Sequence, residues 1–348
     1  MNLVDTFLKL ISIESETGKE DNILDFIEKF LEDNNFQGEI KRNNGGIVAV
    51  PSESSKKIAL VGHVDTVPIV PNQQYEFDND DLIGGRGSVD MKGGIAVILH
   101  SLIENSSEIV GVFYTAEESS YEDNGLNIIM PELLSDFEID FAIILEPTDN
   151  EIQLGCLGAL NATLTISGKA AHSARPWVGD NPIYKVKDVI KLVEDNEINE
   201  IEIDGLIFKQ VMSITKISSG IANNVIPETL MLNLNFRYSP ELNGSEASNY
   251  VNDLFSDYVE VEILNTSDGA MPNKSEEKIS EFIKKTGAVV QPKLAWTDIA
   301  RFFEHKIPCV NFGPGNPLLA HATNEHVSKK QLLESYELLS GYLGVKSE

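Results

Sequence analysis

The sequence has few cationic residues and few cysteines. Lysine and arginine together number 27 against 55 aspartates and glutamates, which gives a formal net charge of −28 at pH 7. Such an excess of negative charge opposes binding to nucleic-acid phosphates and to anionic lipid, so we expect neither a nucleic-acid nor a membrane partner. The two cysteines, Cys156 and Cys309, lie in apolar strand-like runs. They form no disulfide framework and are expected to be buried thiols.

A long apolar run is also missing at the start of the chain. The first 15 residues contain Asp5 and no basic stretch before their apolar residues, so we expect neither a signal peptide nor a membrane anchor, and a cytoplasmic protein. Internal repeats and low-complexity tracts are absent from the sequence. A length of 348 residues suits two domains better than one core, and a hydrophobic content of 42% is ordinary for a globular protein.

The first 158 residues alternate between helical and strand patterns, which predicts an α/β domain. Apolar runs such as IALVG, IVGVFYT and FAIILE are separated by helical segments, as is typical of a mostly parallel sheet flanked by helices. The same pattern resumes from 270 to 348. The expected helices are 21–34, 93–104, 275–286 and 328–343, and the expected strands are 46–50, 57–62, 109–115, 141–146 and the run PCVNF.

Between residues 159 and 269 the pattern changes to strict alternation of apolar and polar residues. Ala162, Leu164 and Ile166 share one strand face, and residues 230–236 repeat the alternation. This region predicts a small ferredoxin-like α+β domain inserted into the larger one, because its order is β-α-β-β-α-β. The expected elements are strand 161–168, helix 181–195, strands 208–218 and 228–238, helix 245–256 and strand 259–265.

Polar residues follow the buried strands at the point where each strand ends. In open α/β sheets the carboxyl ends of the strands build the site. Each residue alone could cap a helix or lie in a solvated loop, and His63 with Asp65 could belong to an ordinary turn. Their number on one expected edge favours a functional site. The residues are His63 and Asp65 after IALVG, Asp90 in GGRGSVDMKGG, Glu117 and Glu118 after IVGVFYTA, Glu146 at the end of FAIILE, and His321 and His326 after PCVNF.

The residue types indicate a catalytic metal site. Histidines and carboxylates without a thiolate suit a catalytic rather than a structural zinc, and the set is large enough for two divalent ions bridged by one aspartate. Two ions about 3.5 to 4 Å apart can share a water and lower its pKa, which is hydrolysis chemistry. Glu117 and Glu118 can both serve one site only where the strand breaks into a turn, so that one binds metal while the other acts as a base.

Several motifs carry a resemblance to a known family. GHVDTVP, GRGSVDMKGG, TAEES, ILEPT and HATNEH, in this order and spacing, resemble the zinc-dependent aminoacylase and carboxypeptidase family of metallohydrolases. The match covers nearly the whole chain. Within that family, GCLGALNATLTISGKAAHSARPWVGDNPIYK, NNVIPE, NFRYSP and WTDIARF most closely resemble the enzymes that desuccinylate succinyl-diaminopimelate. The resemblance implies a zinc-peptidase-like catalytic domain with an inserted lid or dimerisation domain.

Carried across residue by residue, the resemblance implies two zinc ions per chain, for which cobalt or manganese could substitute. Asp65 would orient His63, and Glu117 would be the general base. The remaining histidines of this domain are expected to be ordinary core or surface residues, namely His100, His305 and His326. The implied ligands are His63 and Glu146 for one ion, Glu118 and His321 for the other, and Asp90 as the bridge.

The inserted domain supplies the other candidates. In the resembling family a histidine that matches His172 reaches the active site of the partner subunit, which implies a homodimer formed through the lid; the residue alone would suit a turn. An anionic substrate needs local positive charge in so acidic a protein, so arginines are candidates for its carboxylates, with a simple salt bridge as the alternative for each. The substrate-binding candidates are Asn223, Asn224, Arg237, Arg175 and Arg301.

The expected reaction is hydrolysis of a small acylated amino acid, N-succinyl-LL-2,6-diaminopimelate, to succinate and LL-2,6-diaminopimelate in lysine and diaminopimelate biosynthesis. The resembling enzymes often carry an arginine just before the lid where this sequence has CLGAL, which leaves open how the substrate carboxylates are bound. The alternative is another amidohydrolase of the family, acting on N-acetylornithine, an amino-acid carrier conjugate or a dipeptide. A non-catalytic binding homologue would be expected to lose a ligand or the base, and none is missing.

Overall fold

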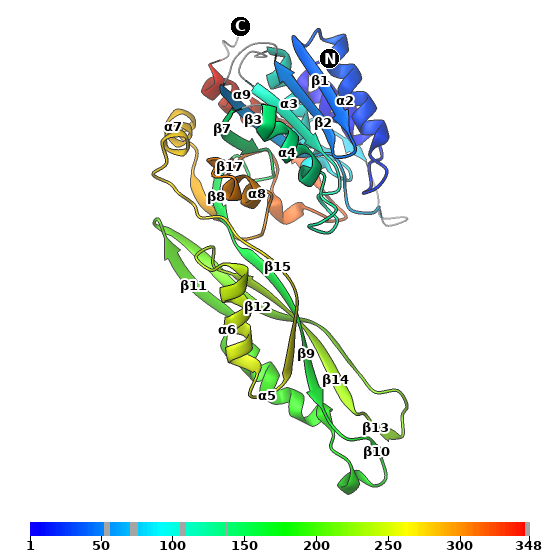
Figure 1. Cartoon of the computed structure of the whole chain (residues 1–348). Helices are drawn as coiled ribbons and strands as arrows, with labels where there is room; N and C mark the ends of the chain where they lie inside the picture. Colours follow the sequence, from blue (N-terminus) through cyan, green and yellow to red (C-terminus); the bar gives the residue numbers. More distant parts are fainter. Residues whose placement is uncertain (52–55, 70–75, 105–108, 137, 345–348) are drawn as a thin grey trace. The chain divides into compact units, whose positions relative to one another are not determined.

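The structure is a computed structural model that describes residues 1–51, 56–69, 76–104, 109–136 and 138–344 (Figure 1). The chain divides into two compact units. Unit 1 comprises Met1–Leu154, Asn273–Gln291 and Arg301–Glu348, and unit 2 comprises Gly155–Pro272 and Pro292–Ala300. The sequence predicted an inserted part at 159–269, and it gave no signal that residues 292–300 return to unit 2.

Unit 1 is built on an eight-stranded sheet. In order across the sheet, the strands are β1 (Gly38–Asn43), β2 (Gly46–Pro51), β6 (Ile109–Tyr114), β3 (Lys56–His63), β7 (Glu138–Ile144), β17 (Cys309–Asn311), β8 (Ile152–Cys156) and β16 (Val290–Lys293). The central strands β6, β3, β7 and β17 run parallel, whereas β1, β2 and β8 pair antiparallel to their neighbours. The predicted mostly parallel sheet is thus confirmed, with antiparallel strands added toward its margins.

The central strands are apolar because the layers of unit 1 cover them. Every residue of β6 is buried, as expected for a parallel strand with neighbours on both sides. Helix α3 (Gly93–Glu104) packs against β3 and β6 and is covered in turn by α1 (Leu3–Ile11), α2 (Asp21–Asp33) and α9 (Lys329–Leu343). Residues 93–102 are consequently all buried, which explains why this helix is apolar around its whole circumference. The other helices are α4 (Leu126–Asp136), α7 (Glu277–Thr286) and α8 (Ile299–Glu304).

A small three-stranded sheet lies beside this core, in the order β18 (His326–Ser328), β5 (Leu82–Gly84) and β4 (Phe77–Asp78). His326 pairs with Gly84, so the end of β5 lies beside the start of β18. The segment that follows β5 contains the irregular turn η1 (Ser88–Lys92), and the segment that precedes β18 contains the short helix η3 (Pro317–Leu319). The ladder therefore brings two loops together that are far apart in sequence.

Unit 2 contains a five-stranded antiparallel sheet. Its strand order is β11 (Ile198–Ile203), β12 (Leu206–Ser219), β14 (Thr229–Tyr238), β9 (Gly158–Ser167) and β15 (Glu260–Ser267). With helices α5 (Pro182–Asp195) and α6 (Gly244–Phe255), the strands β9, β12, β14 and β15 follow the expected β-α-β-β-α-β order. Strand β11 is an addition, because it forms a hairpin with β12 and extends the sheet at one edge.

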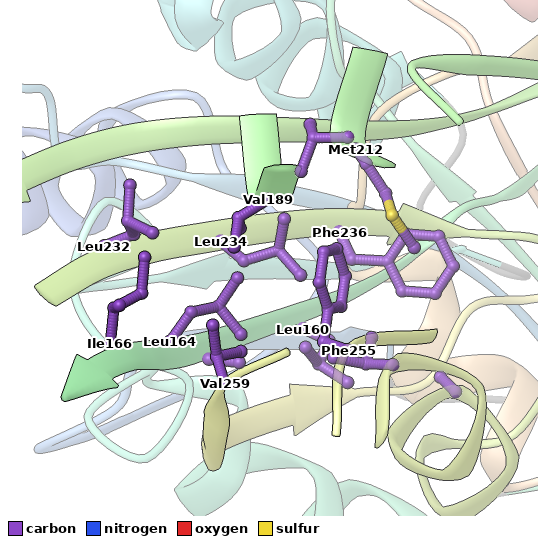
Figure 2. Close-up of a cluster of buried hydrophobic side chains, with 14 of the residues drawn as sticks. Leu160, Leu164, Ile166, Val189, Met212, Leu232, Leu234, Phe236, Phe255 and Val259 are labelled. Atoms are coloured by element: carbon purple, nitrogen blue, oxygen red, sulfur yellow. The ribbon is translucent and has the colours of Figure 1, made fainter. Parts of the chain in front are cut away.

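The core of unit 2 lies between the two helices and one face of the sheet (Figure 2). Leu160, Ala162, Leu164 and Ile166 alternate with half-buried polar residues along β9, as the sequence predicted. They pack with alternate residues of β14 and with the apolar faces of α5 and α6. The helix residues in this core are Val189, Val193, Ala247, Val251 and Phe255.

Hydropathy gives no candidate for a transmembrane helix in the part of the chain that the structure describes.

Candidate metal centre

The side chains predicted to bind metal lie in loops that leave neighbouring strands of unit 1. His63 ends β3, Glu117 and Glu118 follow β6, and Glu146 follows β7. Because β6, β3 and β7 are adjacent and parallel, their carboxyl ends meet at one edge of the sheet. Asp90 comes from the turn η1 after β5 and completes the arrangement.

Two groups of potential ligands share Asp90. His63, Asp90 and Glu146 form one group, and Asp90, Glu118 and His321 form the other, with the ligand atoms of each group within 4.8 Å of one another. The first oxygen of Asp90, Oδ1, lies 2.9 Å from Nε2 of His63, and Oδ2 lies 3.5 Å from Nε2 of His321. One carboxylate thus presents one oxygen to each histidine.

The donor set fits divalent ions of the zinc type. Ligand atoms bound to one zinc at about 2.0–2.2 Å can be at most about 4.4 Å apart. One pair in each group satisfies this limit: His63 Nε2 lies 4.0 Å from Oε1 of Glu146, and His321 Nε2 lies 2.8 Å from Oε1 of Glu118. Two imidazoles and three carboxylates, without a thiolate, match a catalytic rather than a structural site.

Left-handed backbone conformations change the chain direction in two of these loops. Ala116 has a φ of 55° and His321 a φ of 63°, values that non-glycine residues adopt rarely and that cost free energy unless the surroundings impose them. Ala116 lies just after the end of β6 and just before Glu117. It breaks the strand where a turn is needed for both Glu117 and Glu118 to approach one site.

Asp65 is bound mainly to the turn that carries Glu117 and Glu118. Its side chain is buried, and its Oδ1 accepts a hydrogen bond from the backbone N–H of Glu117 at 3.0 Å, while Oδ2 accepts from the N–H of Glu118 at 3.1 Å. The hydroxyl of Thr17 donates to the same Oδ2 at 2.9 Å. Nδ1 of His63 lies 3.0 Å from the backbone oxygen of Asp65 and 3.5 Å from its carboxylate. Asp65 therefore contacts both the ring of His63 and the loop that carries Glu117 and Glu118.

The electrostatics of the cluster favour cations. Burial disfavours the charged form of His63, but hydrogen bonds to Asp65 and Asp90 and the charge of Glu117 outweigh it and raise its pKa well above 6.5. Hydrogen bonds to Asp90 and Glu118 raise the pKa of His321 to about 10. Protons on the two imidazoles thus offset part of the negative charge of the carboxylates in the metal-free protein. A divalent ion must displace these protons when it binds.

Glu325 is a residue that the sequence did not single out. Its carboxylate is 3% exposed and accepts four hydrogen bonds, all from the segment that carries Asp90. Burial raises the pKa of Glu325, and the hydrogen bonds that its carboxylate accepts from backbone N–H groups oppose this shift. The only local sign in the sequence is its position in HATNEH, four residues after His321.

Four of the candidates in unit 2 lie together at the end where β10 (Ala171–His172) pairs with β13 (Val225–Ile226) (Figure 1). His172 is exposed and pairs with Val225, and the N–H of Ser173 donates to the backbone oxygen of Asn224 at 2.9 Å. The N–H of Arg175 donates to the backbone oxygen of His172. Asn223 precedes this ladder and is also exposed.

Arg237 lies apart from these four. It pairs with Val211 and Ala159 near the opposite end of β14, and its half-buried position lowers the pKa of its guanidinium. Hydrogen bonds or ion pairs of this guanidinium are not found among the residues that the structure describes. A half-buried cation of this kind is suited to an anionic ligand.

Arg301, in contrast, is engaged within unit 1. It is 4% exposed, its guanidinium lies 3.8 Å from the ring centre of Tyr121, and its Nη2 donates to the backbone oxygen of Tyr121 at 2.8 Å. Nη1 donates to Oδ1 of Asn127 at 2.5 Å. These contacts hold Arg301 against the segment that follows Glu118, and its contact with substrate stays a prediction.

The three remaining histidines of unit 1 have the ordinary environments expected of them. His100 is buried, and its Nε2 lies 2.9 Å from the hydroxyl of Thr6. His305 is exposed at the end of α8. His326 is half-buried in β18, where its Nδ1 lies close to the backbone oxygen of Asn324. None of the three belongs to the two ligand groups found among the described residues.

Comparison with known proteins gives consistent matches over most of the chain. The model of peptidase family M20/M25/M40 matches residues 59–344. A Mycobacterium tuberculosis protein, provisionally named succinyl-diaminopimelate desuccinylase, is 37% identical over 340 residues, which are 96% of each chain. The succinyl-diaminopimelate desuccinylase of Corynebacterium glutamicum is 35% identical and covers 96% of this chain and 94% of its own length.

Solved structures share the fold. A tripeptidase of Staphylococcus aureus matches with a TM-score of 0.77 at 22% identity, covering 98% of this chain and 96% of the other. A dinuclear metal-binding peptidase of Bacillus subtilis from the M20 family matches with a TM-score of 0.69 at 16% identity, with coverage of 98% and 96%. These structures show the fold, while the family match and the two relatives above 30% identity establish that the chain belongs to peptidase family M20/M25/M40, a family of metal-dependent hydrolases.

Proposed function

We propose that this protein is a two-zinc amidohydrolase that hydrolyses N-succinyl-LL-2,6-diaminopimelate to succinate and LL-2,6-diaminopimelate. The observation that carries the proposal is the shared Asp90, which directs one oxygen to each of two histidine-carboxylate groups. The desuccinylase names of relatives that are 35–37% identical over nearly the whole chain support the substrate. His63 and Glu146 would hold one zinc, Glu118 and His321 the other, and Asp90 both.

The chemistry that the ions would supply at these residues is a water of lowered pKa and polarisation of the substrate's amide carbonyl. Glu117 is the proposed general base, because it adjoins the ligand Glu118 and its charge acts on His63, yet it belongs to neither ligand group. Glu117 accepts a proton from the attacking water and delivers it to the leaving amine. Asp65 holds the N–H groups of Glu117 and Glu118 and so fixes both side chains relative to each other.

His172 is the proposed donor to the oxyanion that develops on the amide carbonyl. The N–H of Ala174 donates to Nδ1 of His172 at 3.1 Å, so Nδ1 is an acceptor and the neutral ring carries its proton on Nε2. An exposed Nε2–H of fixed orientation is suited to an oxyanion.

The placement of the candidates within unit 2 supports a dimer. The tip of unit 2 that carries His172 lies beyond Thr229, and Arg237 is eight residues further along β14, which corresponds to about 26 Å at 3.3 Å per residue. The substrate, in contrast, has an extended backbone about as long as four peptide residues, roughly 14 Å. Side chains stand roughly perpendicular to a sheet and so shorten this separation little, which disfavours contact of one molecule with both residues of the same chain. A homodimer in which His172 of one chain serves the other chain's site removes this conflict.

Arg237 of the chain that binds the metals is the proposed partner for a substrate carboxylate, and Asn223, Asn224 and Arg175 would accompany His172 from the partner subunit. A succinyl-diaminopimelate molecule carries three carboxylates, so several donors are required. The uncharged CLGAL segment before the lid places more of this role on Arg237. Arg237→Gln should therefore raise KM more than it lowers kcat.

The experiment that tests the function compares two substrates on the zinc-loaded protein. Release of succinate from N-succinyl-LL-2,6-diaminopimelate should exceed release of acetate from N-acetylornithine by at least about 100-fold in kcat/KM. A substrate that lacks a carboxylate leaves the polar groups of the site that bind it without partners, and this loss discriminates strongly. Comparable rates on both substrates, or activity only on acetylornithine or a dipeptide, would overturn the proposed substrate while leaving amide hydrolysis in place.

The metal content is tested separately. We expect two divalent ions per chain, loss of activity in a chelator, and recovery on addition of zinc. Glu118→Gln should abolish activity and weaken the binding of one ion, because it removes a ligand of one group alone. Full activity with a single tightly bound ion would rule out the two-metal mechanism.

A further inference from the structure

We propose that Glu325 is a positioning residue of the metal centre, whose carboxylate holds the segment 86–90 in the conformation that presents Asp90 to both ligand groups. The proposal rests on the metal centre proposed above and does not depend on which acylated amino acid is the substrate. Glu325 is not itself one of the ligands found among the described residues.

The hydrogen bonds of Glu325 all reach one short segment. Oε1 accepts from the backbone N–H of Val89 at 2.8 Å and of Asp90 at 3.1 Å, and Oε2 accepts from the N–H of Gly87 at 3.1 Å and from Nη1 of Arg86 at 2.9 Å. A carboxylate has about four lone-pair positions, so this one is saturated. It has no remaining capacity to bind an ion, and its role must be exerted through the segment that it holds.

The segment cannot hold its own shape. Asp90 has φ −119° and ψ 94°, outside helical values, so the turn η1 does not form regular helical hydrogen bonds at this residue. Gly87 has a left-handed φ of 77°, and a Cβ there would lie 2.6 Å from a methyl carbon of Thr66. The N–H of Ser88 bonds to the oxygen of Gly85, but the N–H groups of Gly87, Val89 and Asp90 depend on Glu325.

The position of Glu325 links the two ligand-bearing loops. The segment after β5 carries Asp90, and the segment before β18 carries His321, while the ladder of β5 with β18 joins their ends. Glu325 immediately precedes β18, and its backbone oxygen also accepts from the N–H of Gly85 at 3.2 Å. The residue therefore fixes the bridging ligand from the loop that supplies a ligand of the second group.

The test uses metal-free, full-length protein and measures zinc affinity by competition with a chromophoric chelator. In Glu325→Gln the side-chain NH₂ must face two of the four donors, so the segment loses hydrogen bonds without losing bulk. We expect a decrease of about 10- to 100-fold in zinc affinity, a changed absorption spectrum of the cobalt-loaded protein, and partial recovery of activity with excess zinc. Glu325→Asp, which keeps two acceptor oxygens, should recover part of the affinity.

The matched control is Glu276→Gln. Glu276 also accepts a backbone hydrogen bond, from Ile279 at 3.0 Å, but at the start of α7 and outside both ligand groups. It should bind zinc like the wild type. If folded Glu325→Gln shows wild-type affinity and an unchanged cobalt spectrum, the positioning role is wrong although the metal centre stands. If the wild type binds no divalent ion, the metal centre and the role of Glu325 fail together.

A second measurement covers the case in which Glu325→Gln does not fold. In metal-free wild-type protein, the N–H groups of Gly87, Val89 and Asp90 should exchange with solvent deuterium slowly, because Glu325 holds them without help from an ion. Exchange at the rate of an unprotected loop would overturn the proposal.

Discussion

Replacing Asp65 by asparagine should weaken zinc binding by the Glu118–His321 group more than zinc binding by the His63–Glu146 group. The carboxylate of Asp65 accepts the N–H of Glu117 on one oxygen and the N–H of Glu118 on the other. An asparagine has one oxygen, so its NH₂ must face one of these N–H groups in either orientation. The contact of His63 with the backbone oxygen of Asp65, at 3.0 Å, survives the substitution.

The magnitude follows from the contacts that are lost. A hydrogen bond to a charged group contributes about 1.5–3 kcal/mol, and a buried donor without a partner costs a similar amount. With the side chain of Asp65 buried, Asp65→Asn should lower the free energy of unfolding by about 2–3 kcal/mol. Since Glu117 and Glu118 are displaced together, zinc affinity of the second group and turnover should each fall about 10- to 100-fold.

The assay isolates each group by removing a ligand of the other. Asp65→Asn is introduced into a His321→Gln background, which leaves His63, Asp90 and Glu146, and into a Glu146→Gln background, which leaves the second group. Zinc affinity is then measured by chelator competition. The larger loss should occur in the Glu146→Gln background. A loss confined to the His321→Gln background would mean that Asp65 acts through His63, as the sequence alone suggested, and would refute the reasoning from its contacts.

Three further predictions follow from the same site. Glu117→Gln should keep both ions and the affinity for substrate while losing turnover, because it removes the proton carrier and no ligand; loss of metal would mean that the roles of Glu117 and Glu118 are exchanged. Asp90 and Glu118 raise the pKa of His321 from 6.5 to about 10. The stabilisation that protonated His321 gives the metal-free fold is therefore complete below about pH 6.5 and is lost as the pH rises through about 10. The melting temperature of metal-free protein should fall more steeply over this range than that of His321→Gln, and parallel profiles would contradict this. Refolding Glu117→Gln together with His172→Ala should restore roughly a quarter of wild-type activity if His172 serves the partner's site, and none if it serves its own.

The elements that the sequence predicted well are those whose burial leaves a local pattern. The apolar run of β6 and the continuous apolar helix α3 are covered by their neighbours, and the alternation along β9 reflects a sheet with one covered face. Strand β11 leaves a weak signal, because five of its six residues are exposed or half-buried and the strand is defined by its pairing with β12. Such an edge strand depends on its neighbour more than on its own composition.

The residues that support the metal centre were harder to predict because their contacts are remote in sequence. The spacing of His63 and Asp65 suggested a local pair, whereas the carboxylate of Asp65 bonds to N–H groups 52 and 53 residues away. Glu325 bonds to residues 235 to 239 positions away. The charge of Arg301 made it a candidate for a substrate carboxylate, but its contacts with Tyr121 and Asn127, which are more than 170 residues away, are visible only in the structure.

The two histidines of the candidate metal centre differ in their access to solvent, and this difference predicts an order in which bound ions would be lost. The side chain of His63 is 1% exposed, whereas that of His321 is 50% exposed. An ion bound by His321 and Glu118 would be in contact with water, whereas one bound by His63 and Glu146 would lie among buried side chains. The inner ion should therefore exchange with the solution more slowly and leave last. In a cell short of zinc, the chains would accumulate in a half-loaded form that needs only one further ion to become active, without rebuilding the centre.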